Sequence, residues 1–208
     1  MIIVIGSHNS KQYSELIDQM YRLRARVFSD RLRWDVKVID GRERDKYDDE
    51  SPVYLIYADD TARELKASLR LLPTTGPTLL TDFFWDTRPE AAHLTSPTIW
   101  ECTRFCVNQK ISNGKDNEQI LVTTATMIAA VGELAMRAGI ESILCNINST
   151  MLRLCRRAGC EVQVLGATDR YGEKVYLGLL PISETILVKV RERLNMHALP
   201  TEGLLYSY

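Results

Sequence analysis

The chain has 208 residues, of which 45% are hydrophobic and 25% are charged, as in an ordinary soluble globular protein. Its formal net charge of −1 excludes a global attraction to nucleic acid or to an anionic membrane. The five cysteines follow no CxxC spacing, so neither a disulfide framework nor a zinc site is predicted. We expect a cytoplasmic protein, because no basic leader and no stretch approaching a membrane span is evident. We also expect no bound metal.

The first elements predicted are a strand over Met1–Ile5 and a helix that begins after Asn9 or Ser10 and runs to about Phe28. One face of this helix carries apolar residues at spacings of four, three and four: Leu16, Met20, Leu23 and Val27. Residues 22–46 contain nine Lys or Arg and five acidic residues. This local basic run is either a surface for an anionic partner or a solvated surface without one.

A polar segment from Ser29 to Ser51 follows, without sustained periodicity and long for a structureless connection. Val53–Ala58 and Leu65–Leu72 then read as two strands joined by a turn at residues 59–61. Arg70 lies inside the second of these apolar strands, where it is either an edge residue or the partner of an acid. Glu101 and an aspartate of the polar segment are the acids considered as that partner.

The rest of the chain alternates strands and helices after an irregular segment from Leu79 to Ser96. The strands are predicted over Ile99–Val107, Ile140–Ile147, Glu161–Leu165 and Lys174–Leu180. The helices are predicted over Asn117–Arg137, Thr150–Arg157 and from Ser183 to about Asn195. This order indicates an α/β (α+β) fold, a mixed sheet with helices packed on it. We expect one domain: residues 1–52 as strand, helix and substrate loop, 53–194 as core, and 195–208 as tail.

The stretch Trp100-Glu101-Cys102-Thr103-Arg104-Phe105 places a carboxylate and a guanidinium inside an apolar, β-prone run. Buried charges are costly unless they are paired or used, so both residues are candidates for chemistry. A structural ion pair or a solvated strand face is the alternative. Strand alternation places Glu101 and Arg104 on opposite faces, so their cooperation requires a bulge or splay near Thr103.

The polar segment contains two carboxylates three residues apart, Asp45 and Asp48, and one tryptophan, Trp34. The carboxylates are either a solvated charge run or a site for an ammonium group or a metal. Trp34 is typical of an anchor for loop folding or a lid over a ligand. No nucleotide-binding glycine motif occurs, and the three histidines lie at no catalytic spacing.

Together these residues form one spaced set: Arg24-x3-Phe28-x5-Trp34-x10-Asp45-x2-Asp48-x21-Arg70, then Glu101-x2-Arg104. The set, with the WECTRF stretch, resembles the acyl-homoserine-lactone synthases, the LuxI-type autoinducer synthases, over nearly the whole chain. The resemblance implies a GCN5-type N-acyltransferase fold, with a V-shaped split between central strands opened by a bulge. The pyrophosphate loop of acetyl-CoA-dependent members is absent from residues 110–118.

The reaction implied by the resemblance joins S-adenosylmethionine to an acyl thioester and then closes the lactone, without a cofactor. Glu101 is expected to deprotonate the amine, with Arg104 and Arg70 as further catalytic candidates. The residues expected at S-adenosylmethionine are Arg24, Phe28, Trp34, Asp45 and Asp48. The residues expected around the acyl chain are Trp100, Thr103, Phe105, Met127, Cys145, Ile147, Met151 and Leu152.

The implied acyl donor is acyl carrier protein or acyl-CoA, and the sequence leaves both open. The basic run of residues 22–46, with Arg153, Arg156 and Arg157, is the surface expected to meet an acidic carrier protein. No nucleic-acid or membrane partner is expected. Two other functions stay open at this point: a GCN5-type acyltransferase acting on another amine, and a non-catalytic acyl-binding domain with the same fold.

Overall fold

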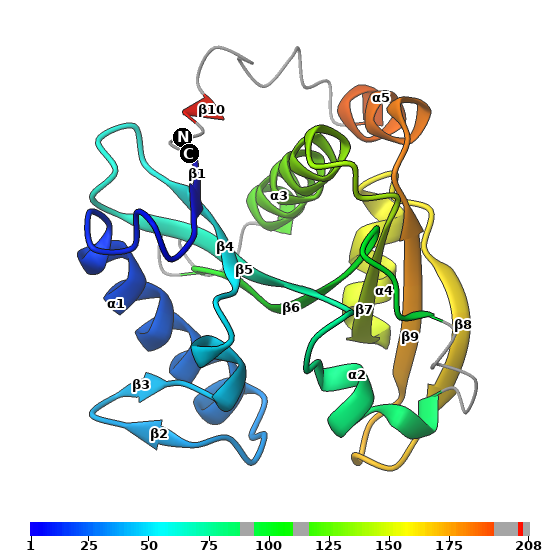
Figure 1. The fold of residues 1–208 in the computed structure, drawn as a ribbon, viewed down its shortest axis with the longest axis horizontal. Coiled ribbons are helices and arrows are strands. Elements are labelled where there is room, and N and C mark those ends of the chain that lie inside the picture. The colour runs from blue at the N-terminus through cyan, green and yellow to red at the C-terminus, as the bar shows by residue number, and fades with distance from the viewer. Residues whose placement is uncertain (88–93, 110–116, 194–203, 206–208) are drawn as a thin grey trace. The chain divides into compact units, whose positions relative to one another are not determined.

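The computed structural model of the protein describes residues 1–87, 94–109, 117–193 and 204–205 (Figure 1). The chain divides into two compact units, which are described separately below. Unit 1 comprises Met1–Arg70, Arg104–Asp116 and Pro200–Tyr208, and unit 2 comprises Leu71–Thr103 and Asn117–Leu199. Strands β5 (Leu65–Pro73) and β6 (Ile99–Val107) each run from one unit into the other. That the chain folds as a single domain stays a prediction.

Unit 1 is built from strands packed against one long helix. Its elements are β1 (Ile2–Ile5), α1 (Ser14–Arg24), η1 (Ala25–Arg31), β2 (Val38–Ile39), β3 (Arg42–Glu43), η2 (Lys46–Asp49), β4 (Val53–Ala58) and β10 (Leu204–Leu205). β1 pairs antiparallel with β4 and parallel with β10, and β5 neighbours β4. The predicted apolar face of α1 is buried and continues into η1, a π-helix, through Val27 and Phe28.

The predicted start of the first helix is wrong, since α1 begins at Ser14 without a side-chain cap. Asn9 instead accepts a hydrogen bond from the Gly6 N–H and donates one to the Val4 carbonyl, so its side chain closes a turn. The segment 29–51 is also more ordered than predicted, because it contains the hairpin β2–β3 and the 3-10 helix η2.

Unit 2 combines a second group of strands with helices. Its elements, besides its part of β6, are α2 (Leu79–Asp82), η3 (Trp85–Thr87), α3 (Asn117–Arg137), β7 (Ser142–Asn148), α4 (Ser149–Arg157), β8 (Gln163–Thr168), β9 (Val175–Pro181) and α5 (Glu184–Arg193). The strand order is β6-β7-β9-β8. β6 runs parallel to β7, and the other neighbours are antiparallel.

Two apolar clusters in unit 2 share β7, whose alternating side chains point to opposite faces. Ile147 packs in a cluster with α3, α4 and α5, which Figure 1 shows near β7 and β9. Leu144 packs in a cluster with Leu80 of α2 and Leu177 of β9. The predicted limits of α3 and β6 agree with the structure, whereas most of the predicted tail 195–208 lies outside the described residues.

Helix α3 is long and apolar enough to span a membrane by length and composition. The expectation that no stretch approaches such a span is therefore wrong on those two criteria. In the structure, 67% of the apolar window is buried inside the protein, as in the core helix of a globular domain. The abundant alanines of α3, with Gly132, allow its close packing, since a Cβ at Gly132 would collide with Leu187 of α5.

All five cysteines are free thiols, and four of them are buried. Burial raises the pKa of Cys106 to about 12 and that of Cys155 to about 11. At neutral pH these two thiols therefore stay protonated and behave as small apolar groups.

Candidate active site

Strand β6 changes its backbone conformation at the WECTRF stretch. Its recorded pairing with β7 ends at Cys102 opposite Cys145, one residue before Thr103, whereas β7 continues to Asn148 paired with β9. Arg104, two residues beyond the last pair, has φ 54°, a left-handed conformation that is rare for residues other than glycine. The strand therefore separates and turns where the sequence requires a bulge or splay.

A buried ion-pair cluster in unit 1 gathers five of the predicted site residues and Glu43 around α1. Its members are Arg24, Glu43, Asp45, Asp48, Arg70 and Arg104. Arg24 donates to both oxygens of Asp48 at 2.8 and 2.9 Å and to Glu43 through Nε. Arg24, Glu43 and Arg70 are each 0% exposed. Three guanidinium groups thus face three carboxylates, so the buried charges are balanced.

Asp45 and Asp48 are held by η2 as well as by the arginines. The Asp45 side chain accepts from the Tyr47 N–H, while the Asp48 side chain accepts from the Asp45 N–H, a reciprocal cap at the start of η2. Arg70 donates to both Asp45 oxygens and to Asp48, which identifies its acid partners as the loop aspartates. The solvated charge run considered from sequence is wrong for Asp48, whose side chain is 0% exposed.

The cluster shifts the pKa of three of its members, Arg24, Asp48 and Arg70. Burial alone would raise the pKa of Asp48, but the hydrogen bonds and charges of Arg24 and Arg70 outweigh it and hold that pKa well below its usual value. Burial alone would lower the pKa of Arg24, but the Asp48 and Glu43 carboxylates outweigh this and hold that pKa above its usual value. Tyr54 donates to Asp48, and burial and the Asp48 charge raise the pKa of the Tyr54 hydroxyl.

Arg104 is the most exposed arginine of the cluster, with 10% of its side chain accessible. Its Nη2 lies 3.1 Å from Glu43 and 2.8 Å from Asp45. Its guanidinium lies 5.1 Å from the centroid of the Phe28 ring, and that ring stacks on Trp34 with centroids 5.1 Å apart. Trp34 therefore folds its loop onto η1 by stacking, and the cluster carries a cation with an aromatic wall.

Glu101 belongs to unit 2 and is 0% exposed. Its Oε2 accepts from the Leu79 N–H at 2.9 Å, and its Oε1 accepts from the Leu80 N–H at 2.8 Å. Asn146 Nδ2 lies 3.5 Å from the same Oε1. Both oxygens therefore receive backbone hydrogen bonds at the start of α2, whose first residues Thr78 caps.

The residues expected around the acyl chain fall into different places. Ile147, Met151 and Leu152 pack in one cluster with α3 and α5, so three of the eight come together. Met127 and Cys145 are also buried in unit 2. The other three are Trp100 and Thr103 on β6 in unit 2 and Phe105 on β6 in unit 1.

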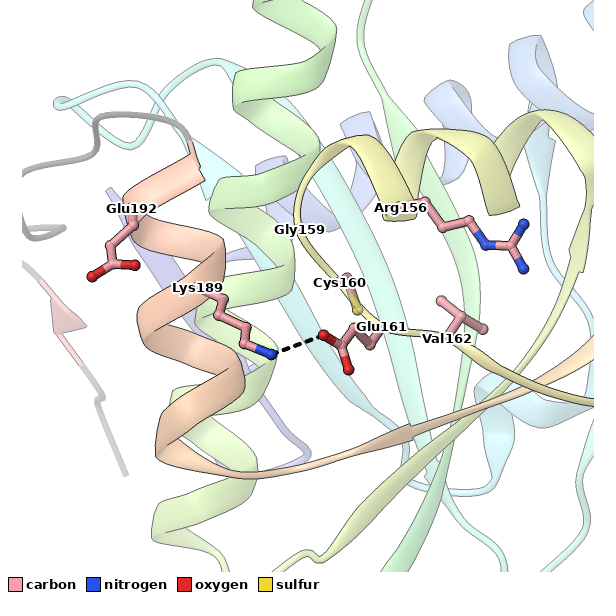
Figure 2. Close-up of a pocket in the computed structure, with 7 residues that line it drawn as sticks. All are labelled: Arg156, Gly159, Cys160, Glu161, Val162, Lys189 and Glu192. Atoms are coloured by element: carbon pink, nitrogen blue, oxygen red, sulfur yellow. Dashed lines mark hydrogen bonds and ion pairs between the residues drawn. The ribbon is translucent and has the colours of Figure 1, made fainter.

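A pocket of about 650 Å³ lies in unit 2 (Figure 2). The connection that follows α4 lines one side of it, and α5 lines the other. Its lining includes Cys160, Val162 and an ion pair between Lys189 and Glu161. No residue of the predicted catalytic, S-adenosylmethionine or acyl sets lines this pocket. Arg156, a residue of the predicted carrier-protein surface, is at its rim.

Two residues lie at the candidate site that the sequence did not predict. Glu43 joins Arg24 to Arg104, and Asn146 lies beside Glu101. Glu43 is a single glutamate in a charged segment without periodicity, so no sequence pattern distinguishes it from the solvent-exposed charged residues around it. An asparagine inside the apolar strand Leu144–Ile147 was a detectable anomaly, since asparagine is depleted in strands.

The fold and the site define an α/β protein of the N-acyltransferase type. A solved structure assigned to the N-acetyltransferases of Lactobacillus plantarum shares this fold alone, with TM-score 0.53 and 18% identity, covering 88% of this chain and 99% of the other. The chain belongs to the autoinducer synthase family, which it matches over residues 7–190.

Similar proteins agree on the activity within this family. An acyl-homoserine-lactone synthase of Rhizobium etli is 38% identical over 167 residues, 80% of this chain and 77% of that protein. The solved structure of the CoA-dependent acyl-homoserine lactone synthase BjaI, with SAM and isopentyl-CoA, has TM-score 0.80 and 27% identity, covering 95% and 90% of the two chains. This activity makes the protein an acyltransferase, and a GCN5-type transfer to another amine is not favoured.

Proposed function

We propose that this acyl-homoserine-lactone synthase acylates the α-amine of S-adenosylmethionine from an acyl thioester and then lactonises the product. The observation that carries the proposal is the cluster that holds Arg104 against the Phe28–Trp34 stack, three residues along β6 from Glu101. It offers a cation and an aromatic wall for a zwitterionic adenosyl ligand. The solved BjaI structure with SAM and isopentyl-CoA supports the same pair of substrates.

The chemistry has two bond exchanges. In the first, the amine nitrogen attacks the thioester carbonyl carbon, the C–S bond breaks, and the thiol leaves while the amine loses its proton. In the second, the carboxylate oxygen attacks its own γ-carbon, the C–S⁺ bond breaks, and methylthioadenosine leaves. Positioning supplies much of the rate in both steps, so no covalent enzyme intermediate is required.

Glu101 is proposed as the acceptor of the amine proton, directly or through water. A carboxylate offers about four lone-pair sites, so a group of this kind can accept backbone hydrogen bonds and also serve as a proton acceptor. Its two backbone hydrogen bonds fix its rotamer, which suits a residue that must meet one particular nitrogen.

The unit 1 residues are proposed to bind S-adenosylmethionine. Phe28 and Trp34 would form the wall of its pocket, and Arg104 would attract the methionyl carboxylate and orient it for ring closure. Arg24 and Arg70 are buried in pairs with acids, so we assign them to bracing Asp45 and Asp48. This arrangement would keep the loop 29–51 folded against α1.

The acyl donor is proposed to be acyl-CoA or acyl carrier protein. Three exposed arginines on α4, Arg153, Arg156 and Arg157, form a cationic surface for phosphates or for an acidic carrier protein. The basic run is a weaker candidate than the sequence indicates. Within this run, the side chain of Arg24 is buried in the protein. Arg22 and Arg42 are paired with Asp18, and Arg44 is paired with Asp49. A cytoplasmic location, and independence of any metal or cofactor, stay predictions.

The test is incubation of the purified protein with S-adenosylmethionine and a panel of acyl-CoA and acyl-carrier-protein donors. We expect release of methylthioadenosine in step with an acyl-homoserine lactone identified by mass spectrometry. Glu101→Gln should lower kcat by about 10²–10⁴-fold, the usual range for a general base. Glu161→Gln, in the exposed pair with Lys189, is the matched control and should retain activity. Full activity of Glu101→Gln would remove the base from the mechanism, and no methylthioadenosine from any donor would contradict the function.

A further inference from the structure

Asn146 carries a buried polar atom that its surroundings do not explain. Its Oδ1 is inaccessible to solvent and has no hydrogen-bond partner among the residues that the structure describes. Buried carbonyl oxygens without a donor are uncommon in folded proteins, because the lost hydration is not replaced. Its neighbours within the sheet are apolar, since Asn146 pairs with Leu177 on β9 and follows the core residue Leu144 by two positions on β7. An unpaired acceptor is especially costly there.

The orientation of the Asn146 amide follows from Glu101. Its Nδ2 faces the Oε1 of Glu101 at 3.5 Å. A carboxylate oxygen attracts the amide N–H and repels the amide carbonyl, so Nδ2 must be the atom that points toward it. The carbonyl oxygen is consequently turned away from the carboxylate and left without a donor.

The position of Asn146 in the sheet coincides with the end of the β6–β7 pairing. The last pair is Cys102 opposite Cys145, so Asn146 is the first β7 residue beyond it. Glu101 lies opposite Leu144, which places Asn146 diagonally across from it on the same face. The Glu101 carboxylate and the Asn146 side chain thus lie side by side where the strands stop pairing.

We propose that Asn146 is a further substrate-positioning residue, whose Oδ1 accepts a hydrogen bond from the α-amine of S-adenosylmethionine while Glu101 faces the same nitrogen. An ammonium or amine group has several N–H donors, and two adjacent acceptors fix its orientation better than one. With one N–H directed to Asn146 and another to Glu101, the nitrogen lone pair formed on deprotonation has a defined direction toward the thioester carbon. The inference rests on the proposed function of Glu101.

The amide N–H groups of a pantetheine-linked donor could supply the same hydrogen bond, so the test separates the two sources. Asn146→Leu removes both polar atoms at nearly constant volume. The key measurement is the Kd for S-adenosylmethionine and for its deamino analogue, with no acyl donor present. We expect Asn146→Leu to weaken binding of S-adenosylmethionine by roughly 3- to 10-fold, the usual range for one hydrogen bond, and to leave binding of the deamino analogue unchanged.

Steady-state kinetics give the second measurement. KM for S-adenosylmethionine should rise in Asn146→Leu while KM for the acyl donor stays constant. If the leucine variant does not fold, Asn146→Ala takes its place, and the same change in the two KM values is expected. Ser68→Ala is the matched control, because Ser68 Oγ is another buried atom without a hydrogen-bond partner among the described residues. It should alter neither KM. An unchanged preference for S-adenosylmethionine over the deamino analogue in Asn146→Leu would overturn the inference, as would a rise in the donor KM alone.

The same experiments separate this inference from the proposed function. Should Glu101→Gln lose turnover while Asn146→Leu keeps wild-type binding and kinetics, the inference fails and the function of Glu101 stands. Should the wild-type protein bind the two adenosyl compounds equally and Glu101→Gln turn over normally, the proposed amine site itself is wrong.

Discussion

The two regions that carry the proposed chemistry hold their charges in opposite ways. In unit 1, three arginines and three carboxylates neutralise one another, and most of these side chains are buried. In unit 2, Glu101 is held by two backbone N–H groups and lies beside the amide of Asn146. The first arrangement fixes side chains through charge, and the second fixes a carboxylate through neutral dipoles.

This difference indicates different tasks. A buried ion-pair network stabilises one arrangement and resists a change in protonation, because each partner keeps the other charged. A carboxylate that accepts two backbone N–H groups keeps a fixed orientation, and this suits a group that must exchange a proton. We therefore expect substitutions among the buried ion pairs of unit 1 to act mainly on stability, and substitution of Glu101 itself to act mainly on turnover.

The largest stability effect is expected from Asp48→Asn, which leaves the Arg24 and Arg70 charges with one buried acid fewer. Removal of one partner from a buried network costs about 3–5 kcal/mol, and thermal or urea unfolding measures the loss. Asp49→Asn is the matched control, since the Asp49 side chain is 75% exposed in its pair with Arg44. It should cost less than about 1 kcal/mol. Equal losses in both variants would show that the cluster does not brace the loop.

The same cluster predicts the direction of the pH dependence. Because the pKa of Asp48 is depressed in the folded protein, its contribution to stability is present above the unfolded pKa of about 4 and disappears as pH falls through the folded value. Wild-type stability should therefore fall below about pH 4, and Asp48→Asn should show a shallower fall. Urea midpoints between pH 7 and pH 3 measure the difference. Parallel curves for the two proteins would contradict the assignment.

The sequence predicted most of the regular elements because their signals are local. The limits of β4, β6 and α3 agree with the prediction, since apolar runs and helical periodicity mark them. The spacing of the site residues also identified the family, and an acid partner was one of the two alternatives predicted for Arg70. Its choice of Asp45 and Asp48 over Glu101 depends on how η2 folds, which no local pattern encodes.

The features that the sequence could not supply are those created by long-range contact. Glu43 acquires its role from guanidinium groups 19 and 61 residues away. The backbone hydrogen bonds of Glu101 come from Leu79 and Leu80, inside a segment predicted to be irregular. Strand alternation argued against joint action of Glu101 and Arg104, and the predicted irregularity appears as the end of the β6–β7 pairing at Cys102 and the left-handed conformation at Arg104.

The left-handed backbone at Arg104 leads to the prediction with the smallest expected effect, a difference in stability between two variants of this residue. Arg104→Ala and Arg104→Gly both lose the contacts to Glu43 and Asp45, so both should lose activity. They differ only in the backbone, and glycine adopts φ 54° without the steric cost that alanine carries. Arg104→Gly should thus be more stable than Arg104→Ala by about 1 kcal/mol in urea unfolding. At Lys66, the second residue of β5, the order should reverse, since glycine weakens an ordinary strand. If the glycine and alanine variants rank in the same order of stability at both positions, the backbone at Arg104 is not strained. The bulge then has no measurable cost in the free energy of unfolding.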